Sequence, residues 1–370
     1  MLRPFGFLAF YYLMFGYPWW RLTSMLLPAF QWGSIELAAL LVSPAALFIG
    51  SRRLPSPLRH WSARLVYLWL GASWILMCLS LPWELVYLLA PLDARLSGLA
   101  LLALFTAITS FACVNANRLR VVTVRLSSPK ITKPIRALQL SDVHVGSRSP
   151  AFLARVVKAS NALAPDVVFI TGDLIDGQGV KRTDLAPLGT IKAPAFFVIG
   201  NHERYVDCDE ICIKLRNLGL HVLRNQSEQV RVNGVDLCVS GIDDADDPAQ
   251  VGDVLATNEA LWEFCSRAYS ILLYHRPDGL EDAAQAGFDL MLCGHTHNGQ
   301  LVPFNALVKR RFPRIKGLYR HGSTSLYVSV GTGTWGPPMR LGSVNELTIL
   351  ELVQQDPADT RLLVDESSRR

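Results

Sequence analysis

The chain has 370 residues, enough for more than one domain, and half of them are hydrophobic. Its net charge of +5 belongs mainly to residues 1–116, which hold seven Arg, no Lys and three acidic side chains. The remaining residues carry 29 basic and 28 acidic side chains, so they lack the strongly basic balance of a domain that grips nucleic acid duplexes. Composition therefore argues against nucleic acid as a partner.

Residues 1–116 contain two uncharged apolar runs, 65–83 and 96–114, each long enough to cross a ~30 Å hydrocarbon core as a helix. Two weaker apolar segments precede them, at residues 4–20 and 26–50. We therefore predict an all-α transmembrane region over residues 1–116 with four spanning helices, in contact with the lipid bilayer. The alternative is two spans, with the first two segments lying in the membrane interface.

Arginine residues indicate how this region is oriented. The loop before the third segment holds four of them, and three more follow the fourth segment: Arg52, Arg53, Arg59, Arg64, Arg118, Arg120 and Arg125. Positively charged loops stay in the cytoplasm, and both span counts satisfy this rule. We expect a multi-pass protein of the cell membrane whose following domain is cytoplasmic.

The seven cysteines are too sparse for a secreted disulfide scaffold, and their odd number favours reduced thiols in a reducing compartment. Cys208 and Cys212 lie one helical turn apart. We interpret them as two partly buried thiols on a helix rather than as metal ligands, because no second pair of cysteines is near.

Residues 117–134 form a linker with a first strand, and from residue 135 to residue 370 the pattern is that of one α/β domain. Short apolar runs of β type alternate with helical patterns at 152–163 and 209–218. The first five runs read RALQL, DVVFI, AFFVI, YSILLY and FDLMLC, and SLYVSV and NELTILEL come later.

Each of the first five runs ends directly before polar residues that suit metal binding: Asp142 and His144 in SDVHVG, Asp173 in TGDLID, Asn201 and His202 in GNHE, His275 in YHRP, and His295 and His297 in GHTHNGQ. Ligands of α/β sheets bind beyond the carboxyl ends of the strands, where these residues fall. Carboxylate, imidazole and amide oxygen are ligands for Zn, Mn, Fe or Ni rather than for Ca. The ordered set therefore predicts a metal site.

The order and spacing of these motifs resemble the calcineurin-like metallophosphoesterase superfamily over residues 135–352. GHTHNGQ and the later GTGTWGPPMRLG are similar to the bacterial branch that joins such a domain to an N-terminal membrane region. That branch usually has Gly at the position of Asn298, so we expect a different backbone shape after His297. It also more often has Pro-Glu where this chain has Asn345 and Glu346.

The resemblance implies a four-layer αββα metallophosphatase sandwich that holds two divalent metal ions, Mn, Fe, Zn or Ni. It implies one metal on Asp142, His144, Asp173 and His297, and a second on Asp173, Asn201, His275 and His295. Asp173 would bridge the two. A bridging hydroxide would attack phosphorus in line, while His202 donates a proton to the leaving oxygen.

The implied reaction is hydrolysis of a phosphodiester or pyrophosphate, which makes the chain a hydrolase. A short stretch separates the last apolar segment from Asp142, which favours a membrane-associated, lipid-linked substrate. Relatives with this layout resemble UDP-2,3-diacylglucosamine pyrophosphohydrolases. A general phosphodiesterase or phosphatase on soluble substrates is the alternative. A non-enzymatic membrane scaffold would be expected to lack ligands, and all seven positions and His202 are filled. Oligomeric state is not indicated.

Four further charged features lie outside the predicted ligand set. We expect Glu203 to orient neighbouring groups. The acidic run at 243–247 is either a solvated turn or part of the site wall, and Arg340 is either a surface residue or a ligand of substrate phosphate. The basic run KRRFPRIKGLYR, Lys309 to Arg320, is either a membrane-surface contact or a solvated loop.

Overall fold

The computed structural model describes residues 2–51, 54–55, 58–90, 92–177, 179–244, 249–257 and 267–355. Arg52, Arg53 and part of the acidic run (Asp246 and Asp247) lie outside these residues. The chain forms two units. The first consists of Met1–Asn117 with Trp335–Leu341, and the second of Arg118–Thr334 with Gly342–Arg370.

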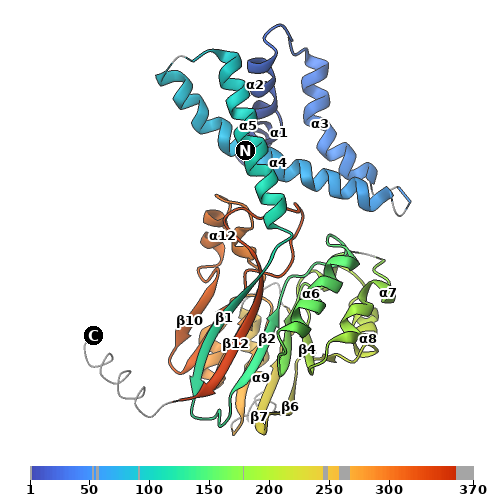
Figure 1. The fold of residues 1–370 in the computed structure, drawn as a ribbon, viewed down its shortest axis with the longest axis vertical. Helices are drawn as coiled ribbons and strands as arrows, with labels where there is room; N and C mark the ends of the chain where they lie inside the picture. The colour runs from blue at the N-terminus through green and yellow to red at the C-terminus, as the bar shows by residue number, and fades with distance from the viewer. Residues whose placement is uncertain are drawn as a thin grey trace, which may run out of the picture. The chain divides into compact units, whose positions relative to one another are not determined.

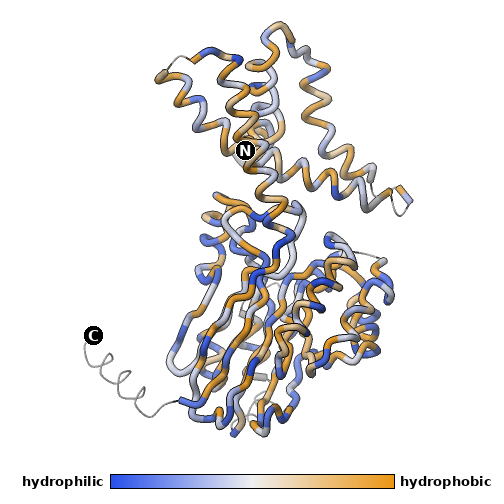
Figure 2. The backbone as a smooth tube through the Cα atoms, viewed as in Figure 1, coloured by the Kyte–Doolittle hydropathy of each residue, from blue (hydrophilic) through white to orange (hydrophobic). Residues whose placement is uncertain are grey.

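The first unit is built from helices, which are coloured as hydrophobic along most of their length in Figure 2. They are α1 (Leu2–Phe15), α2 (Tyr17–Leu26), α3 (Ser34–Ser51), α4 (Leu58–Leu89) and α5 (Ala94–Asn115). Within the described residues, two stretches are long and apolar enough to cross a membrane, Trp61–Leu89 and Ala94–Asn115. These contain the two strongest predicted segments. The predicted segment 4–20 is instead divided between α1 and α2, because Pro18 starts a new helix in its first turn.

One charged pair lies within this unit. Arg21 donates from Nε and Nη2 to the two carboxylate oxygens of Glu84, at 2.6 and 3.1 Å. The Trp335–Leu341 segment belongs to the same unit, where the backbone N–H of Arg340 donates to the carbonyl of Ala112 at 2.9 Å. The carbonyl of Arg340 accepts from Asn115 Nδ2 at 3.0 Å, and the Arg340 side chain is fully buried. The interpretation of Arg340 as a surface residue is therefore wrong.

The second unit contains, within its described residues, two six-stranded sheets (Figure 1). Across the first sheet the order is β1 (Leu119–Ser128), β12 (Asn345–Gln354), β2 (Ile135–Leu140), β3 (Val167–Thr171), β4 (Ala195–Val198) and β5 (His221–Val222). Across the second it is β10 (Gly317–His321), β11 (Thr324–Val328), β9 (Leu290–Cys293), β8 (Tyr269–Leu273), β7 (Val235–Gly241) and β6 (Gln226–Val232). Strands β2 to β5 are parallel to one another, as are β7, β8, β9 and β11.

Alternating side chains of the strands build separate cores on the two faces of each sheet. In β3, Val168 and Ile170 pack with α6 (Pro150–Ala162) and α8 (Cys208–Arg216), whereas Val167 and Phe169 pack against the second sheet. The other face of the second sheet packs against α9 (Ala249–Thr257) and α11 (Leu280–Gln285). This arrangement confirms the predicted αββα sandwich. Strands buried on both faces explain why their sequences read as continuous apolar runs.

The cysteines agree only in part with the prediction. Cys208 and Cys212 are free thiols on α8, as expected. Cys78, Cys113 and Cys293, which lie elsewhere in the chain, are also free thiols. Cys238, however, is disulfide-bonded. This bond is contrary to the expectation that the thiols are reduced, since disulfides persist in oxidising surroundings.

Candidate metal centre

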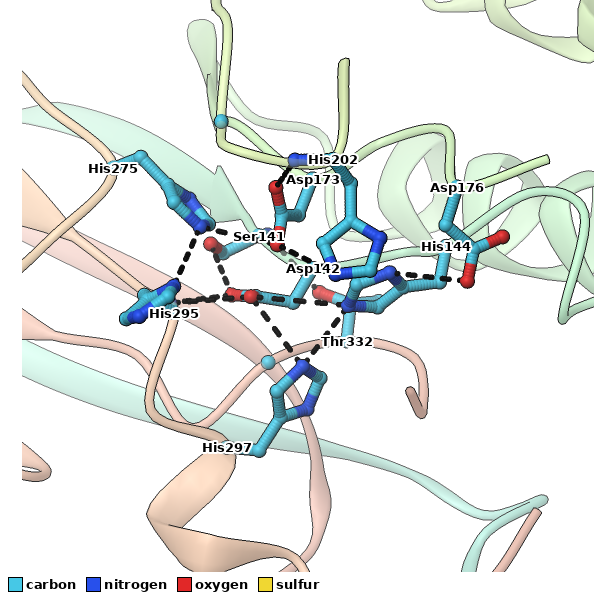
Figure 3. A network of polar contacts seen from close by, with 12 residues as sticks. Ser141, Asp142, His144, Asp173, Asp176, His202, His275, His295, His297 and Thr332 are labelled. Atoms are coloured by element: carbon cyan, nitrogen blue, oxygen red, sulfur yellow. Dashed lines mark hydrogen bonds and ion pairs between the residues drawn. The ribbon is translucent and has the colours of Figure 1, made fainter. Parts of the chain in front are cut away.

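All eight predicted site residues follow strands, and the two sheets contribute to the same place (Figure 3). Asp142 follows β2, Asp173 follows β3, and Asn201 and His202 follow β4, all in the first sheet. His275 follows β8, and His295 and His297 follow β9, in the second sheet. Three overlapping groups have ligand atoms within 4.8 Å of one another: Asp142, His144 and His297; Asp173, His275 and His295; and His144, Asp173 and His202.

The first group has the spacing of ligands to one ion. His144 Nε2 and His297 Nε2 lie 3.0 Å apart, and Asp142 Oδ1 lies 3.4 Å from His297 Nε2 and 4.0 Å from His144 Nε2. Two imidazole nitrogens this close can both lie ~2.1 Å from a single metal ion. Without a cation or a shared proton, their lone pairs would repel each other.

The second group repeats this geometry. His275 Nε2 lies 3.1 Å from His295 Nδ1 and 3.1 Å from Asp173 Oδ2. His275 Nδ1 lies 2.8 Å from the carbonyl of Thr171, which favours a proton on Nδ1 and leaves Nε2 free for a metal. His202 Nε2 is 3.9 Å from Asp173 Oδ2, longer than a hydrogen bond. His202 thus borders both groups without belonging tightly to either.

Asn201 tests whether a metal fits this site. Its Oδ1 atom is buried, and within the described residues it has no hydrogen-bond partner. A buried amide oxygen without a partner carries a free-energy penalty, which coordination to a cation would remove. The residues on either side are fixed, since Gly200 N donates to Glu203 Oε2 at 2.7 Å and His202 N donates to Asp173 Oδ1 at 2.9 Å. The donor set therefore fits divalent cations.

The backbone of the site is held in an unusual conformation. Five of the predicted ligands have a positive φ, between 49° and 71°: Asp142, His144, Asp173, His295 and His297. This region is disfavoured for residues with a Cβ, and such strain gathers at functional sites. Backbone bonds between the motif loops hold it, with Asp142 N donating to the carbonyl of Gly172 at 3.1 Å and His144 N to that of Asp173 at 3.0 Å.

The motif glycines let the loops approach one another closely. A Cβ on Gly200 would lie 2.2 Å from Asp173 Oδ1, and one on Gly294 would lie 2.3 Å from Asp142 Oδ2. Neither space can hold a side chain. Gly200 and Gly294 are therefore required by packing against a ligand.

Glu203 orients the backbone of the loops that carry the site, as predicted. It is fully buried and accepts backbone N–H groups from Asp173 at 3.0 Å, Ile175 at 2.8 Å and Gly200 at 2.7 Å. It thereby ties the loop after β3 to the loop after β4. Burial, together with the negative charge of Asp173, raises the pKa of Glu203 to about 8.

Carboxylates and imidazoles in the site set each other's protonation. Burial by itself raises the pKa of Asp173 and lowers that of His275, but their mutual attraction reverses both effects. The pKa of His275 consequently rises to about 10, and that of Asp173 falls well below its usual range. A metal ion would replace the proton on His275, since an imidazole must be neutral at the coordinating nitrogen.

Two polar partners of the site were not predicted. Asp176 Oδ2 lies 3.4 Å from His144 Nδ1 and accepts from the hydroxyl of Ser147 at 2.6 Å, so it orients the His144 ring. Its position in the TGDLID turn was the available signal. Arg276, directly after His275, donates to both carboxylate oxygens of buried Asp244 at 2.7 and 3.0 Å. The interpretation of the acidic run as a solvated turn is therefore wrong at Asp244.

The loop after His297 does not need a new shape to accept Asn298. Asn298 has φ 49° and ψ 37°, the left-handed conformation that a glycine adopts readily. Asn is the side chain that tolerates this region best after Gly, and here its Nδ2 donates to the carbonyl of Gly342 at 3.2 Å. The Asn298 side chain thus stabilises the loop in this conformation.

A cavity of about 490 Å³ is lined by residues that follow Asp176 and His202 in the chain. Its lining includes Gly177, next to Asp176, and Tyr205, whose ring meets that of His202 edge-on at 5.6 Å. Lys181 and Lys214 also line it. The volume is within the range of small-molecule sites, so the cavity can hold part of a substrate.

Known proteins share these features. A family model described as calcineurin-like phosphoesterase matches residues 135–299. A Helicobacter pylori protein named "Uncharacterized metallophosphoesterase" is 35% identical over 235 residues, 62% of this chain and 62% of that protein. A Bos taurus protein named "Transmembrane protein with metallophosphoesterase domain" is 36% identical over 241 residues, 60% of this chain and 54% of that protein. The chain thus spans less than two thirds of the length of either relative.

A protein of Aquifex aeolicus, also named "Uncharacterized metallophosphoesterase", is 33% identical over 244 residues. The match covers 63% of this chain and 92% of that protein, so nearly the whole of the relative corresponds to the domain that carries the site. The chain belongs to the calcineurin-like metallophosphoesterase family.

Proposed function

We propose that the chain is a membrane-anchored hydrolase that uses two divalent cations to cleave a phosphodiester or pyrophosphate bond in a lipid-linked substrate, such as UDP-2,3-diacylglucosamine. The observation that carries the metal-dependent chemistry is the buried, unpartnered Oδ1 of Asn201 beside two pairs of imidazole nitrogens 3.0 and 3.1 Å apart. A site that needed no cation would not be expected to leave all of these lone pairs facing inward.

In this proposal Asp142, His144, Asp173 and His297 hold one cation. Asp173, Asn201, His275 and His295 hold the other. The cations, Mn, Fe, Zn or Ni, would act as Lewis acids on the phosphate oxygens. They would also lower the pKa of the attacking water.

His202 has the position of a proton donor to the leaving oxygen. It adjoins both ligand groups and is half-buried, and its Nε2 lies 3.9 Å from Asp173 Oδ2. Burial lowers its pKa, which eases release of the proton.

The short link between helix and sheet supports a lipid-linked substrate. Helix α5, which is long and apolar enough to cross a membrane, ends at Asn115, and β1 begins at Leu119. A domain attached so closely would meet membrane-borne phosphates at high local concentration. The Arg-rich loops favour the cytoplasmic side, with four spanning helices.

The test uses the full chain in detergent, stripped of metal and reconstituted separately with Mn, Fe, Zn or Ni. Turnover would be measured on UDP-2,3-diacylglucosamine and on bis(p-nitrophenyl) phosphate. We expect activity only after metal addition, at a metal-to-protein ratio of about two, and a higher kcat/KM for the lipid-linked substrate. Equal kcat/KM for both substrates would favour a general phosphodiesterase, and metal-independent turnover would refute the proposed chemistry.

A further inference from the structure

The segment of residues 303–320, here called the basic segment, differs in charge from the rest of its domain. It contains six basic side chains and no acidic one: Lys309, Arg310, Arg311, Arg314, Lys316 and Arg320. Outside this segment, the residues from 117 to the end carry 23 basic and 28 acidic side chains. Positive charge in this domain is therefore concentrated in one short stretch.

Most of this charge is exposed and is not neutralised. Arg314 pairs with Glu281, but for Lys309, Arg310 and Arg311 the described part of the chain shows no ion pair with an acidic side chain. These three form the last turn of α12 (Asn305–Arg311), a helix that has no buried residue. Asp278 lies within electrostatic range of Arg311 but forms no ion pair with it in the described residues. Exposed basic groups without an ion pair favour an anionic partner.

The same helix also exposes apolar side chains. Phe304 is 40% exposed and Leu307 is 49% exposed, next to the basic turn. Leu318 in β10 is 40% exposed as well. Basic residues that adjoin exposed Phe and Leu are typical of elements that lie in the headgroup region of a bilayer. A soluble polyanion would use the charges but would not need the apolar side chains.

The basic segment packs directly on the metal centre. The ring of Phe312 meets that of His295 edge-on at 5.0 Å, and the hydroxyl of Thr296 donates to the carbonyl of Ile315 at 2.6 Å. Of the eight predicted site residues, His295 and His202 alone are not classed as buried. The open side of the centre is therefore bordered at His295 by the basic segment.

We propose that the basic segment is a membrane-contact surface that binds anionic lipid headgroups and so holds the open side of the metal centre against the bilayer. Leu307 and Phe304 enter the interface, while Lys309, Arg310 and Arg311 bind the headgroups. The inference rests on the proposed membrane attachment, and it adds the surface and the lipid chemistry through which the domain meets the membrane.

The test is hydrogen–deuterium exchange of the full chain in lipid nanodiscs, because this measurement needs neither activity nor labelled cysteines. Discs of phosphatidylcholine would be compared with discs that also contain phosphatidylglycerol. We expect backbone amides of 303–320 to exchange at least about threefold more slowly in the anionic discs. The difference should disappear in about 0.5 M NaCl, where the Debye length falls to ~4 Å.

Two variants with the same change in charge separate this surface from general electrostatics. The triple change Lys309→Glu, Arg310→Glu and Arg311→Glu should abolish the protection. The control replaces three other exposed lysines by Glu: Lys133, Lys158 and Lys192. Lys133 and Lys192 precede β2 and β4, at the edge opposite the metal centre, so this variant should keep the protection.

Equal exchange in the two kinds of disc, or equal loss of protection in the two variants, would overturn the proposal. Protection in neutral discs on addition of inorganic phosphate would also overturn it, because it would indicate a site for soluble anions. Turnover of bis(p-nitrophenyl) phosphate reports the phosphoesterase activity separately. Both triple variants should retain it, so failure of the membrane contact can be distinguished from failure of the proposed chemistry.

Discussion

Replacement of His202 by Ala removes a side chain while leaving the local backbone bond intact. The bond from His202 N to Asp173 Oδ1, 2.9 Å, does not involve the imidazole. The imidazole Nε2 lies 3.9 Å from the nearest oxygen of Asp173, too far for a hydrogen bond. We therefore expect bound metal to be unchanged and turnover to fall by ~10²–10⁴, the usual contribution of a positioned acid. This corresponds to ~3–5 kcal/mol in the activation barrier.

The size of the loss should depend on the leaving group. An alkoxide needs a proton as it departs, whereas p-nitrophenolate leaves readily without one. Two matched phosphodiesters that differ only in this group should therefore show a large loss of kcat for the alkyl ester and a small one for the nitrophenyl ester. Metal content would be measured in the same samples. His221→Ala is the matched control, because His221 pairs with Glu228 and stacks on Phe196, outside the site.

Two outcomes would refute this reasoning. Equal losses of kcat for both esters would show that His202 does not donate the proton. Loss of metal in His202→Ala would make His202 a ligand, which its place within 4.8 Å of His144 and Asp173 permits geometrically.

Three further substitutions probe the support of the site. Asp173→Asn should lose both metal and activity, since in the proposed arrangement it removes the carboxylate that both cations share; metal content after dialysis checks this. Gly200→Ala should also lose metal, because the new Cβ would lie 2.2 Å from Asp173 Oδ1, and a stoichiometric metal content would contradict it. Glu203→Gln should leave one of three buried N–H groups, that of Ile175, facing an amide N–H, at a cost of about 1–3 kcal/mol in the free energy of unfolding. An unchanged denaturation midpoint would argue against this role of Glu203.

Much of the sandwich and the place of the site could be predicted because the relevant signals are local. Each parallel strand is an apolar run. The polar residues that directly follow such a run must lie at the carboxyl edge of the sheet. Asp142, Asp173 and His275 could therefore be grouped without any knowledge of the pairing of strands. The ladder between β1 and β12 could not be predicted, because Leu119 and Asn345 are partners separated by most of the chain.

The interpretations that failed concern polar residues whose partners are distant in sequence. Asp244 lies in an acidic run typical of a solvated turn, but its carboxylate pairs with Arg276, which lies 32 residues later in the chain. Arg340 looked like a surface residue next to a glycine-rich tail, but it is buried in the helical unit. The burial of a charged side chain depends on what packs around it, and a run of sequence letters does not contain that information.

The metal centre draws its groups from the edges of two separate sheets: Asp142 and Asp173 from one, His275 and His297 from the other. Cations bound there would link the two sheets, because each sheet supplies some of their ligands. Separating the sheets would then require release of the cations. The free energy of unfolding should therefore rise by about 1.4 kcal/mol for each bound cation and each tenfold rise in free metal above the dissociation constant. Metal supply would thereby regulate how long the enzyme survives in the cell as well as how fast it works.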